Sequence, residues 1–197
     1  SSCRIEIPDV YQFLDCGLDL YAPQTTLDAE GRRILSAWVR MPKVTDEGWI
    51  GMFCTPRVVE VRDGHIFFPM HPNVRAAYSQ EIPAGSQRAK DGYLVSLDLE
   101  DGEELDVGGF VIRREGDRIC TDRSAVFPSF PGAHLRSETP ALKGGCHLDV
   151  VVGKDLVEVF VNEGECVISN AVYGLEDKIG CSGEGKKMRM HIFSAQR

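Results

Sequence analysis

The arrangement of short β-branched runs and turn residues constrains the fold of this chain more than any other sequence feature. Runs typical of strands cover residues 33–39, 58–62, 66–69, 93–99, 107–113, 148–152, 156–161, 166–172 and 188–193. Turn residues separate many of them, at Asp63-Gly64, Asp101-Gly102, Glu115-Gly116-Asp117, Gly153-Lys154-Asp155 and Asn162-Glu163-Gly164. Short strands with turns at this spacing are typical of hairpins, so the sequence predicts an all-β fold with a β-sandwich of two antiparallel sheets.

Alternation within the run at 156–161 predicts which side chains face the core. Val157, Val159 and Val161 form one apolar face, whereas Glu158 and Phe160 lie on the other. Successive side chains of a strand point to opposite faces of its sheet. We therefore expect the valines in the core and Glu158 near solvent.

One segment has a helical rather than a strand-like sequence. It runs from Asn73 to Tyr78 after Pro72, and Pro69 stiffens the approach to it. On this basis we expect a boundary between two structural units near residues 70–80. The segments 84–92 and 127–140 are rich in loop-forming residues and are expected to be exposed loops.

Charge and hydrophobicity argue against two classes of partner. The chain has a formal net charge of -8, and its short basic cluster is Lys186-Lys187-Met188-Arg189. Binding to a phosphate backbone requires a concentrated basic surface, so we expect no nucleic acid partner. No apolar run approaches the roughly 20 residues of a spanning helix, so we expect no membrane role.

The seven cysteines are expected to be free and mostly buried thiols. They are scattered without a Cys-x-x-Cys pair, and their odd number leaves at least one unpaired. Cys146 and His147 come closest to a pair of metal ligands, but neighbouring strand residues point to opposite faces, so we expect no metal site. Free thiols favour a reducing compartment and, with no Asn-x-Ser/Thr sequon, a bacterial cytoplasmic location over secretion.

A series of short motifs runs through the chain in a consistent order. They are Phe13-Leu14-Asp15-Cys16-Gly17, Asp19-Leu20-Tyr21-Ala22, Gly31-Arg32-Arg33-Ile34-Leu35, Gly48-Trp49-Ile50-Gly51, Thr55-Pro56-Arg57, Thr121-Asp122-Arg123-Ser124 and the run from Val157 to Glu165. Together they resemble glycoside hydrolase family 32, which includes invertase, levanase, inulinase and sucrose-6-phosphate hydrolase. The chain departs from the family at Leu20, where phenylalanine is usual, so an apolar side chain is kept but an aromatic ring is lost.

The resemblance implies a division of the chain into three parts. Residues 1–70 would be the end of a five-bladed β-propeller, residues 71–80 a linker with a short helix, and residues 81–197 the C-terminal β-sandwich. A single blade lacks the neighbours that cover its faces and the ring closure that removes its edges. We therefore expect the leading segment to mediate self-association into a homo-oligomer.

The resemblance also implies a reaction that this chain is not expected to catalyse alone. Retaining members of the family hydrolyse terminal β-fructosyl bonds of sucrose, sucrose 6-phosphate or fructans with two carboxyl groups about 5 Å apart. The family's Asn-Asp-Pro-Asn-Gly and Arg-Asp-Pro motifs are absent from the 197 residues. Glu165-Cys166 copies the acid/base dipeptide but follows a hairpin turn far from any propeller motif, so we interpret it as a coincidence. We expect no catalytic residue and no cofactor in this chain.

Four residues are candidates for a sugar site that forms only together with the rest of the propeller. The resemblance places Asp19, Tyr21 and Gln24 near the mouth of the active site, where hydrogen-bonding groups position hydroxyls. Trp38 would offer a flat face to the C–H edges of a sugar. The alternative is that Tyr21 and Trp38 belong to the blade core. The expected partners are the rest of the catalytic propeller and, through it, sucrose or a fructan.

Two further functions remain open beside that of an enzyme fragment. The sandwich could be a carbohydrate-binding module, although that would need an exposed aromatic platform and the residues after 80 include no tryptophan. The chain could also be a self-standing protein-interaction module descended from such an enzyme. Fold analogy alone does not separate these alternatives.

Overall fold

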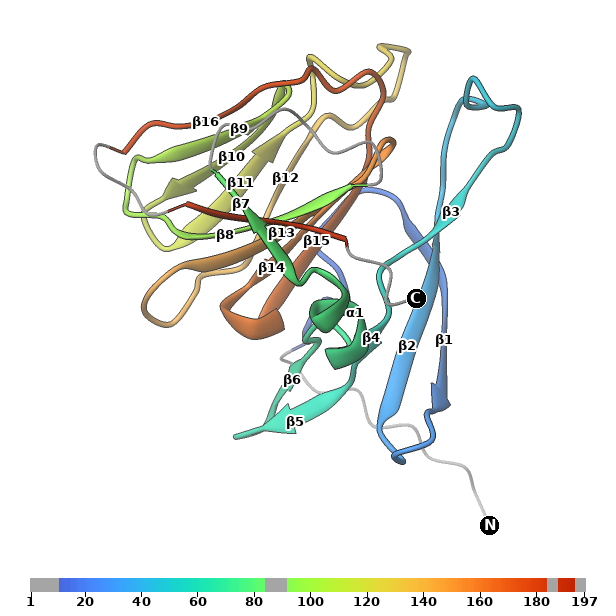
Figure 1. The fold of residues 1–197 in the computed structure, drawn as a ribbon, viewed down its shortest axis with the longest axis vertical. Helices are drawn as coiled ribbons and strands as arrows, with labels where there is room; N and C mark the ends of the chain where they lie inside the picture. The colour runs from blue at the N-terminus through green and yellow to red at the C-terminus, as the bar shows by residue number, and fades with distance from the viewer. Residues whose placement is uncertain (1–10, 84–91, 184–187, 194–197) are drawn as a thin grey trace.

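The computed structural model describes residues 11–83, 92–183 and 188–193 of the chain. Every strand pair within them is antiparallel, and the strands form sheets of six, five, four and two members. In Figure 1 the six- and five-stranded sheets stack as a sandwich, and a long hairpin from the N-terminal part stands beside it. The predicted all-β fold, with a sandwich after a smaller N-terminal unit, is confirmed.

The N-terminal unit is built on the four-stranded sheet. Its strands are β1 (Leu20–Leu27), β2 (Arg33–Val39), β3 (Met52–Phe53) and β4 (Arg57–Val58), and β2 pairs with the other three. A separate hairpin, β5 (Glu60–Arg62) and β6 (His65–Phe67), turns at Asp63 and Gly64, which both have positive φ. Positive φ at both positions is the requirement of a two-residue type I′ turn, so the predicted Asp-Gly turn is confirmed.

A short helix follows this unit and leads into the sandwich. It is α1 (Pro72–Ala77), and Nδ1 of His71 accepts a hydrogen bond from the backbone N–H of Asn73 at 3.1 Å. Pro72 fits the first helical position because the N–H it lacks would have no partner there. The helix lies within the range expected for the linker, and the limits of the two domains stay a prediction.

The six-stranded sheet of the sandwich takes its strands from residues 80–192, including the last strand of the described chain. In order across the sheet they are β15 (Cys166–Ala171), β14 (Leu156–Val161), β13 (His147–Val152), β8 (Tyr93–Asp98), β17 (Arg189–Ile192) and β7 (Gln80–Ile82). The turn between β14 and β15 is a short 3-10 helix, η1 (Asn162–Gly164). Its residues all have positive φ, so the turn predicted at this point is confirmed.

The five-stranded sheet differs in several places from what the sequence predicts, and its strands at 118–122 and 179–181 were not predicted. Its strands are β12 (Arg136–Glu138), β11 (Arg118–Asp122), β10 (Phe110–Glu115), β9 (Glu104–Val107) and β16 (Ile179–Cys181). The single run predicted at 107–113 is two strands, because Gly108 and Gly109 adopt positive φ and form a turn. The segment 127–140, expected to be a loop, contains β12. The loop expected at 84–92 lies almost entirely outside the described residues.

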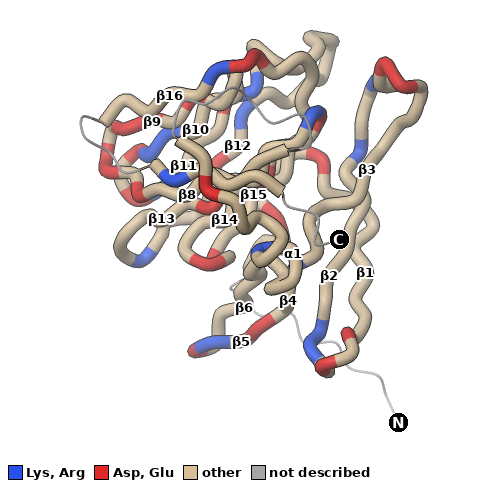
Figure 2. Tube along the Cα trace, viewed as in Figure 1, with Lys and Arg blue, Asp and Glu red and all other residues tan. Residues whose placement is uncertain are grey.

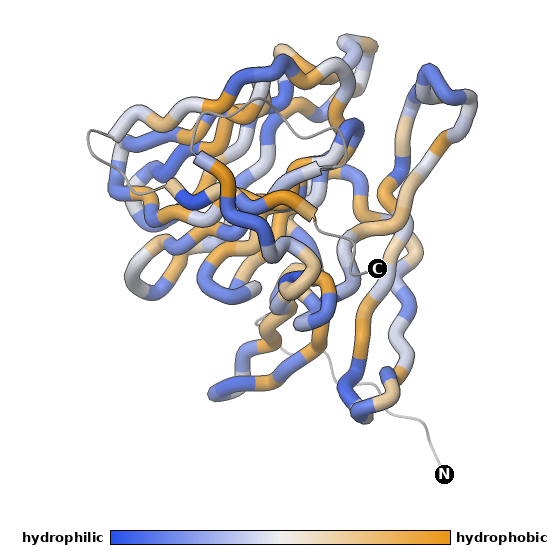
Figure 3. The backbone as a smooth tube through the Cα atoms, in the orientation of Figure 1, coloured by the Kyte–Doolittle hydropathy of each residue, from blue (hydrophilic) through white to orange (hydrophobic). Residues whose placement is uncertain are grey.

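Two apolar clusters hold the molecule together. The first fills the space between the two sandwich sheets and includes Val157, Val159 and Val161, as predicted. The second joins the N-terminal unit to the opposite face of the six-stranded sheet, with Leu35 and Val39 on one side and Phe160 and other residues on the other. Figure 3 shows the corresponding hydrophobic stretches along β2 and the sandwich strands. Each large apolar side chain buried in this way contributes about 1.5–3 kcal/mol.

The second cluster overturns the prediction for Glu158. Its side chain was expected near solvent, but it is fully buried, at 0% exposure. The six-stranded sheet is covered on both faces, by the five-stranded sheet on one and by the N-terminal unit on the other. The face of β14 that carries Glu158 and Phe160 is therefore an interface between the two units rather than a solvated surface.

Candidate functional site

The hairpin of β1 and β2 has one face that packs on the sandwich and one that is open. Leu35, Ala37 and Val39 of β2 are buried in the cluster shared with the sandwich. Because strand side chains alternate, Trp38 projects from the other face, and 41% of its surface is exposed. Tyr21 lies directly opposite Trp38, is 53% exposed, and its ring centroid is 6.2 Å from that of Trp38.

A β-bulge in β1 brings Gln24 to the same open face. Tyr21 pairs with Trp38 and Gln24 pairs with Ser36, so the residues Ala22 and Pro23 lie opposite a single residue of β2. Ala22 has a φ of 47°, in the left-handed region that a bulge accommodates. Without the bulge, residues three apart would point to opposite faces. The open face thus collects Tyr21, Gln24 and Trp38, three of the four predicted sugar-site residues.

Two further residues shape this aromatic pair. The guanidinium of Arg40 lies 5.2 Å from the centroid of the Tyr21 ring, within range of a cation–π interaction. Gly51 has a φ of 80°, and a Cβ at this position would overlap the indole of Trp38. The open face therefore presents a tyrosine, an indole, an amide and a guanidinium, which suit a polyhydroxylated ligand with apolar C–H edges.

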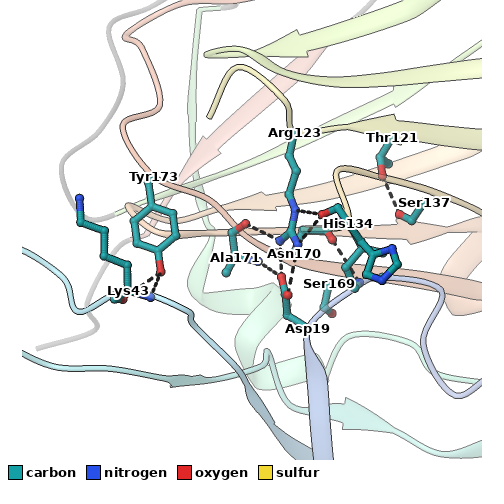
Figure 4. A network of polar contacts seen from close by, with 12 residues as sticks. Asp19, Lys43, Thr121, Arg123, His134, Ser137, Ser169, Asn170, Ala171 and Tyr173 are labelled. Carbon is teal, nitrogen blue, oxygen red and sulfur yellow. Dashed lines mark hydrogen bonds and ion pairs between the residues drawn. The ribbon is translucent and has the colours of Figure 1, made fainter. Parts of the chain in front are cut away.

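Asp19 lies apart from the open face. It is 7% exposed and forms a two-pronged ion pair with the guanidinium of Arg123, from the sandwich. Its Oδ2 also accepts a hydrogen bond from the backbone N–H of Ala171 at 2.8 Å. In Figure 4 the Asp19 and Arg123 side chains point toward one another between hairpin and sandwich. A sugar-binding role for Asp19 stays a prediction; in this structure its carboxylate joins the two units.

Arg123 is fixed from several sides. Its Nε and Nη2 donate to the carbonyl oxygen of His134 at 3.1 and 2.9 Å, and its Nη1 donates to the carbonyl oxygen of Ala171 at 2.9 Å. Its guanidinium carbon also stacks 3.5 Å from the Phe127 ring centroid. A planar guanidinium with this many partners is oriented before it meets the carboxylate, which favours a buried pair.

A second buried ion cluster joins the same two units. Arg57 of the N-terminal unit is fully buried; its Nη1 lies 2.8 Å from Oδ2 of Asp15, and its Nη2 donates to Oε1 of Glu158 at 2.9 Å. Glu158 Oε2 also accepts the backbone N–H of Thr55 at 2.7 Å. The Oγ of Ser169 touches both carboxylates, at 2.8 Å from Asp15 and 2.9 Å from Glu158.

The hydrogen-bond donors of this cluster are fewer than its oxygen–oxygen contacts, so one additional proton can be bound there. Arg57 Nη2 also donates to Ser169 Oγ, which has a single hydrogen and can donate it to only one of the two carboxylates. The contact between Ser169 Oγ and the other carboxyl group becomes a hydrogen bond when that carboxyl group carries a proton and donates it to the hydroxyl oxygen. Burial raises the pKa of Asp15, despite the opposing effect of Arg57, so Asp15 is placed to carry this proton.

The two carboxyl groups of this cluster are closed to solvent. Asp15 and Glu158 share Ser169 Oγ, but their side chains are 3% and 0% exposed, so a substrate cannot reach them. Glu165 is at the turn before β15, where its Oε2 accepts a hydrogen bond from Nδ2 of Asn162 at 2.8 Å. That position in the sandwich agrees with its interpretation as a coincidental copy of the acid/base dipeptide.

In the sequence, Asp15, Arg57 and Arg123 stand out only as members of motifs that resemble the family, and no role was predicted for them. Their partners in the other unit lie about a hundred or more positions away along the chain, for example 104 residues between Asp19 and Arg123. A buried charge leaves no periodic signal, so the motif membership was the one sequence signal available for them.

The described residues also bear on metal binding, on the thiols and on membrane spanning. Among the described residues, no group of three or more His, Cys, Asp or Glu side chains is placed to hold a metal ion. The six described cysteines are free, and Cys3 lies outside the described part. They were expected to be mostly buried, but only Cys54 and Cys146 are; Cys16, Cys120, Cys166 and Cys181 are partly exposed. No helix in residues 11–83, 92–183 and 188–193 is long and apolar enough to cross a membrane.

Comparison with known proteins matches both halves of the chain to domains of one enzyme family. Residues 3–72 match the family described as "Glycosyl hydrolases family 32 N-terminal domain", and residues 94–194 match "Glycosyl hydrolases family 32 C terminal". The sucrose-6-phosphate hydrolase of Vibrio alginolyticus is 28% identical over 176 residues, which cover 81% of this chain and 36% of that protein. The raffinose invertase of Escherichia coli is 31% identical over 188 residues, covering 85% of this chain and 40% of the relative.

Solved structures share the fold. The sucrose-6-phosphate hydrolase from Lactobacillus gasseri superposes with a TM-score of 0.76 at 21% identity, over 92% of this chain and 42% of that one. The β-fructofuranosidase of Bombyx mori gives 0.74 at 17% identity, over 94% and 43%. The chain thus spans well under half the length of these similar proteins. With its N-terminal and C-terminal parts both matched in order, this chain belongs to glycoside hydrolase family 32.

Proposed function

We propose that this chain is the last-blade and sandwich portion of a β-fructofuranosidase-type hydrolase and is inactive on its own. The observation that carries the proposal is the two-sided hairpin of β1 and β2. One face is fastened to the sandwich, and the other holds Tyr21, Gln24 and Trp38 open to solvent. Such a face suits a wall of a sugar site that is completed by other blades.

In this proposal the sandwich serves as a support. The Arg57 cluster, the Asp19–Arg123 pair and the shared apolar cluster fix the hairpin, so the open face keeps its geometry. Tyr173 adds a further tie, because its hydroxyl donates to the carbonyl oxygen of Lys43 at 2.9 Å (Figure 4). A rigid supporting layer is what a binding site needs to hold its contacts in place.

The substrate class follows from the relatives by analogy. The bacterial relatives include sucrose-6-phosphate hydrolases and a raffinose invertase, so sucrose, its 6-phosphate or a fructan is the proposed substrate of the complete enzyme. Family members use two carboxyl groups about 5 Å apart for retaining hydrolysis, and we propose that both come from outside this chain.

The alternative of a carbohydrate-binding sandwich has less support. A groove of about 540 Å³ crosses the outer face of β10, β11 and β12. Its lining includes Arg113, Glu115, Thr121 and Ser137 but no aromatic side chain. Sugar sites of binding modules rely on aromatic rings, so this groove fits the requirement poorly.

The test is fructose release by the purified chain and by a chimaera. We expect the chain alone to release no fructose from sucrose, sucrose 6-phosphate or inulin. A chimaera in which this chain replaces the matching segment of the Vibrio alginolyticus hydrolase should be active. In it, Tyr21→Ala and Trp38→Ala should each lower kcat/KM at least tenfold, and Phe193→Ala, which changes an exposed ring elsewhere, should not. Fructose release by the chain alone would disprove the proposal.

A further inference from the structure

Two cysteines from different units meet where the leading segment runs along the sandwich. Cys16 precedes β1, and Cys166 is the first residue of β15. The backbone N–H of Cys16 donates to the carbonyl oxygen of Val167 at 2.7 Å, so the two backbones are immediate neighbours. Both side chains are partly exposed and pack against the edge of the sandwich core.

The segment that carries Cys16 is held tightly against β15. Asp15 Oδ1 accepts hydrogen bonds from the backbone N–H groups of Gly17 and Ser169, at 2.7 and 3.0 Å. The backbone N–H of Leu18 donates to Oδ1 of Asn170 at 3.2 Å. The position of Cys16 relative to β15 is therefore fixed on both sides of the cysteine, as a crosslink without backbone movement requires.

The two thiols are in direct contact. The two thiols interact through a hydrogen bond between their side chains. This bond lowers the pKa of Cys166 and raises the pKa of Cys16. With its lowered pKa, Cys166 has the larger thiolate fraction and attacks first, and the backbone contact at Val167 places Cys16 beside it to resolve the mixed disulfide.

We propose that Cys16 and Cys166 are a redox-active pair whose oxidation to a disulfide locks the N-terminal unit to the sandwich. The oxidant is a small-molecule disulfide such as oxidised glutathione. The Cys166 thiolate attacks one of its sulfurs and releases one glutathione thiolate. Cys16 then gives its proton to the released glutathione thiolate and attacks the Cys166 sulfur of the mixed disulfide, releasing the second glutathione thiolate, which takes a proton from solvent. Two protein thiols become one disulfide, and one glutathione disulfide becomes two thiols.

The crosslink would act on the contact between the two units. It joins positions 150 residues apart, so it restricts the unfolded chain over most of its length and stabilises the docked state. The reduced pair leaves that contact to the ion clusters and the apolar cluster alone. Oxidation would therefore raise the midpoint of thermal unfolding and slow proteolysis between the two units, and reduction would reverse both changes.

The experiment uses the wild-type chain in buffers of graded oxidised to reduced glutathione. We expect the loss of two of the seven free thiols and, in a non-reduced digest, a peptide pair joined through Cys16 and Cys166. Dithiothreitol should restore both thiols and the lower unfolding midpoint. Peptide mapping on the wild-type chain gives this result even where a variant folds poorly.

Matched variants separate this pair from general oxidation. Cys16→Ser and Cys166→Ser should each abolish the crosslink, whereas Cys120→Ser should not, because Cys120 lies on the other sheet. Burial raises the pKa of Cys54 and of Cys146 to about 11, so these two thiols should stay reduced. A mixed disulfide that persists on Cys166 without transfer to Cys16, or a thiol count that stays at seven, would overturn the proposal.

Discussion

Arg57 and Arg123 each neutralise a carboxylate that belongs to the other unit. Arg57 comes from the N-terminal unit and pairs with Glu158, and Arg123 comes from the sandwich and pairs with Asp19. Buried pairs contribute little when compared with an apolar replacement of both partners, but removing one partner leaves an uncompensated charge in a place without water. The two arginines therefore make the docking of the units depend on single side chains.

Replacing Arg57 by methionine should lower the free energy of unfolding by about 3–5 kcal/mol, because Asp15 and Glu158 would remain buried without a cation. Urea titration followed by circular dichroism measures the change. The matched control is Arg62→Met, which removes an arginine paired with Glu60 and Glu163 at the surface and should cost less than about 1 kcal/mol. Equal losses in the two variants would contradict the role given to the Arg57 cluster.

The same cluster predicts a pH dependence. Burial raises the pKa of Asp15, so the folded state prefers its protonated form. Its contribution to stability is complete below the ordinary aspartate pKa of about 3.9 and is lost as the pH rises through the raised value. Asp15→Asn cannot ionise, and the difference in unfolding free energy between wild type and variant should change over that pH window. A difference that is flat with pH would contradict the assignment of the proton to Asp15.

The segment from Asp15 to Asp19 is the element that docks the N-terminal unit along β15. Gly17 is its tightest point, because a Cβ at this position would overlap the backbone of Ser169. Gly17→Ala should push the segment away and cost about 1–3 kcal/mol, with faster hydrogen exchange at the amides of residues 15–19. In Gly145→Ala the new methyl group would meet no atom within 4 Å, and exchange should be unchanged. Similar exchange in both variants would argue against tight docking.

Comparison of individual strands and turns with their predictions shows which features local sequence patterns can predict. The limits of β2 and β14 and the turn at Asp63-Gly64 follow from local alternation and turn chemistry, and all were predicted. The turn at Gly108-Gly109 was missed because apolar residues on both sides of it read as one continuous strand. Glu158 was misplaced for a different reason: alternation identifies the two faces of a strand, but not what covers the second face.

The candidate sugar site shows the same limit. Tyr21 and Trp38 were candidates from motif resemblance, and their shared face depends on the pairing of β1 with β2. Gln24 lies on the same face only because of the bulge at Ala22, and the sequence pattern does not predict this bulge. Asp19 is adjacent to β1, yet its carboxylate faces Arg123, since a partner 104 residues away outweighs the local strand pattern.

For the molecule as a whole, exposed apolar side chains are concentrated in one unit. In the described part of the chain, large exposed hydrophobic residues outside residues 11–67 are Phe130 and Phe193. The N-terminal unit carries the others, including Phe53 at 78% and Val61 at 71% exposure. In Figure 2 its charged residues gather at hairpin tips, which leaves the strands between them uncharged along much of their length. An apolar surface of this kind favours contact with another protein surface.

On its own, this chain should bind a second copy of itself through this surface. We expect light scattering and sedimentation to show association that increases with protein concentration. Phe53→Lys places a charge on the most exposed ring and should raise the dissociation constant at least tenfold, because burying a phenylalanine contributes about 1.5–3 kcal/mol and each 1.4 kcal/mol is a factor of ten. Phe130→Lys adds the same charge to an exposed ring of the sandwich and should leave association unchanged. A wild-type chain that stays monomeric at high concentration would show that the N-terminal unit, although apolar, does not pair with itself.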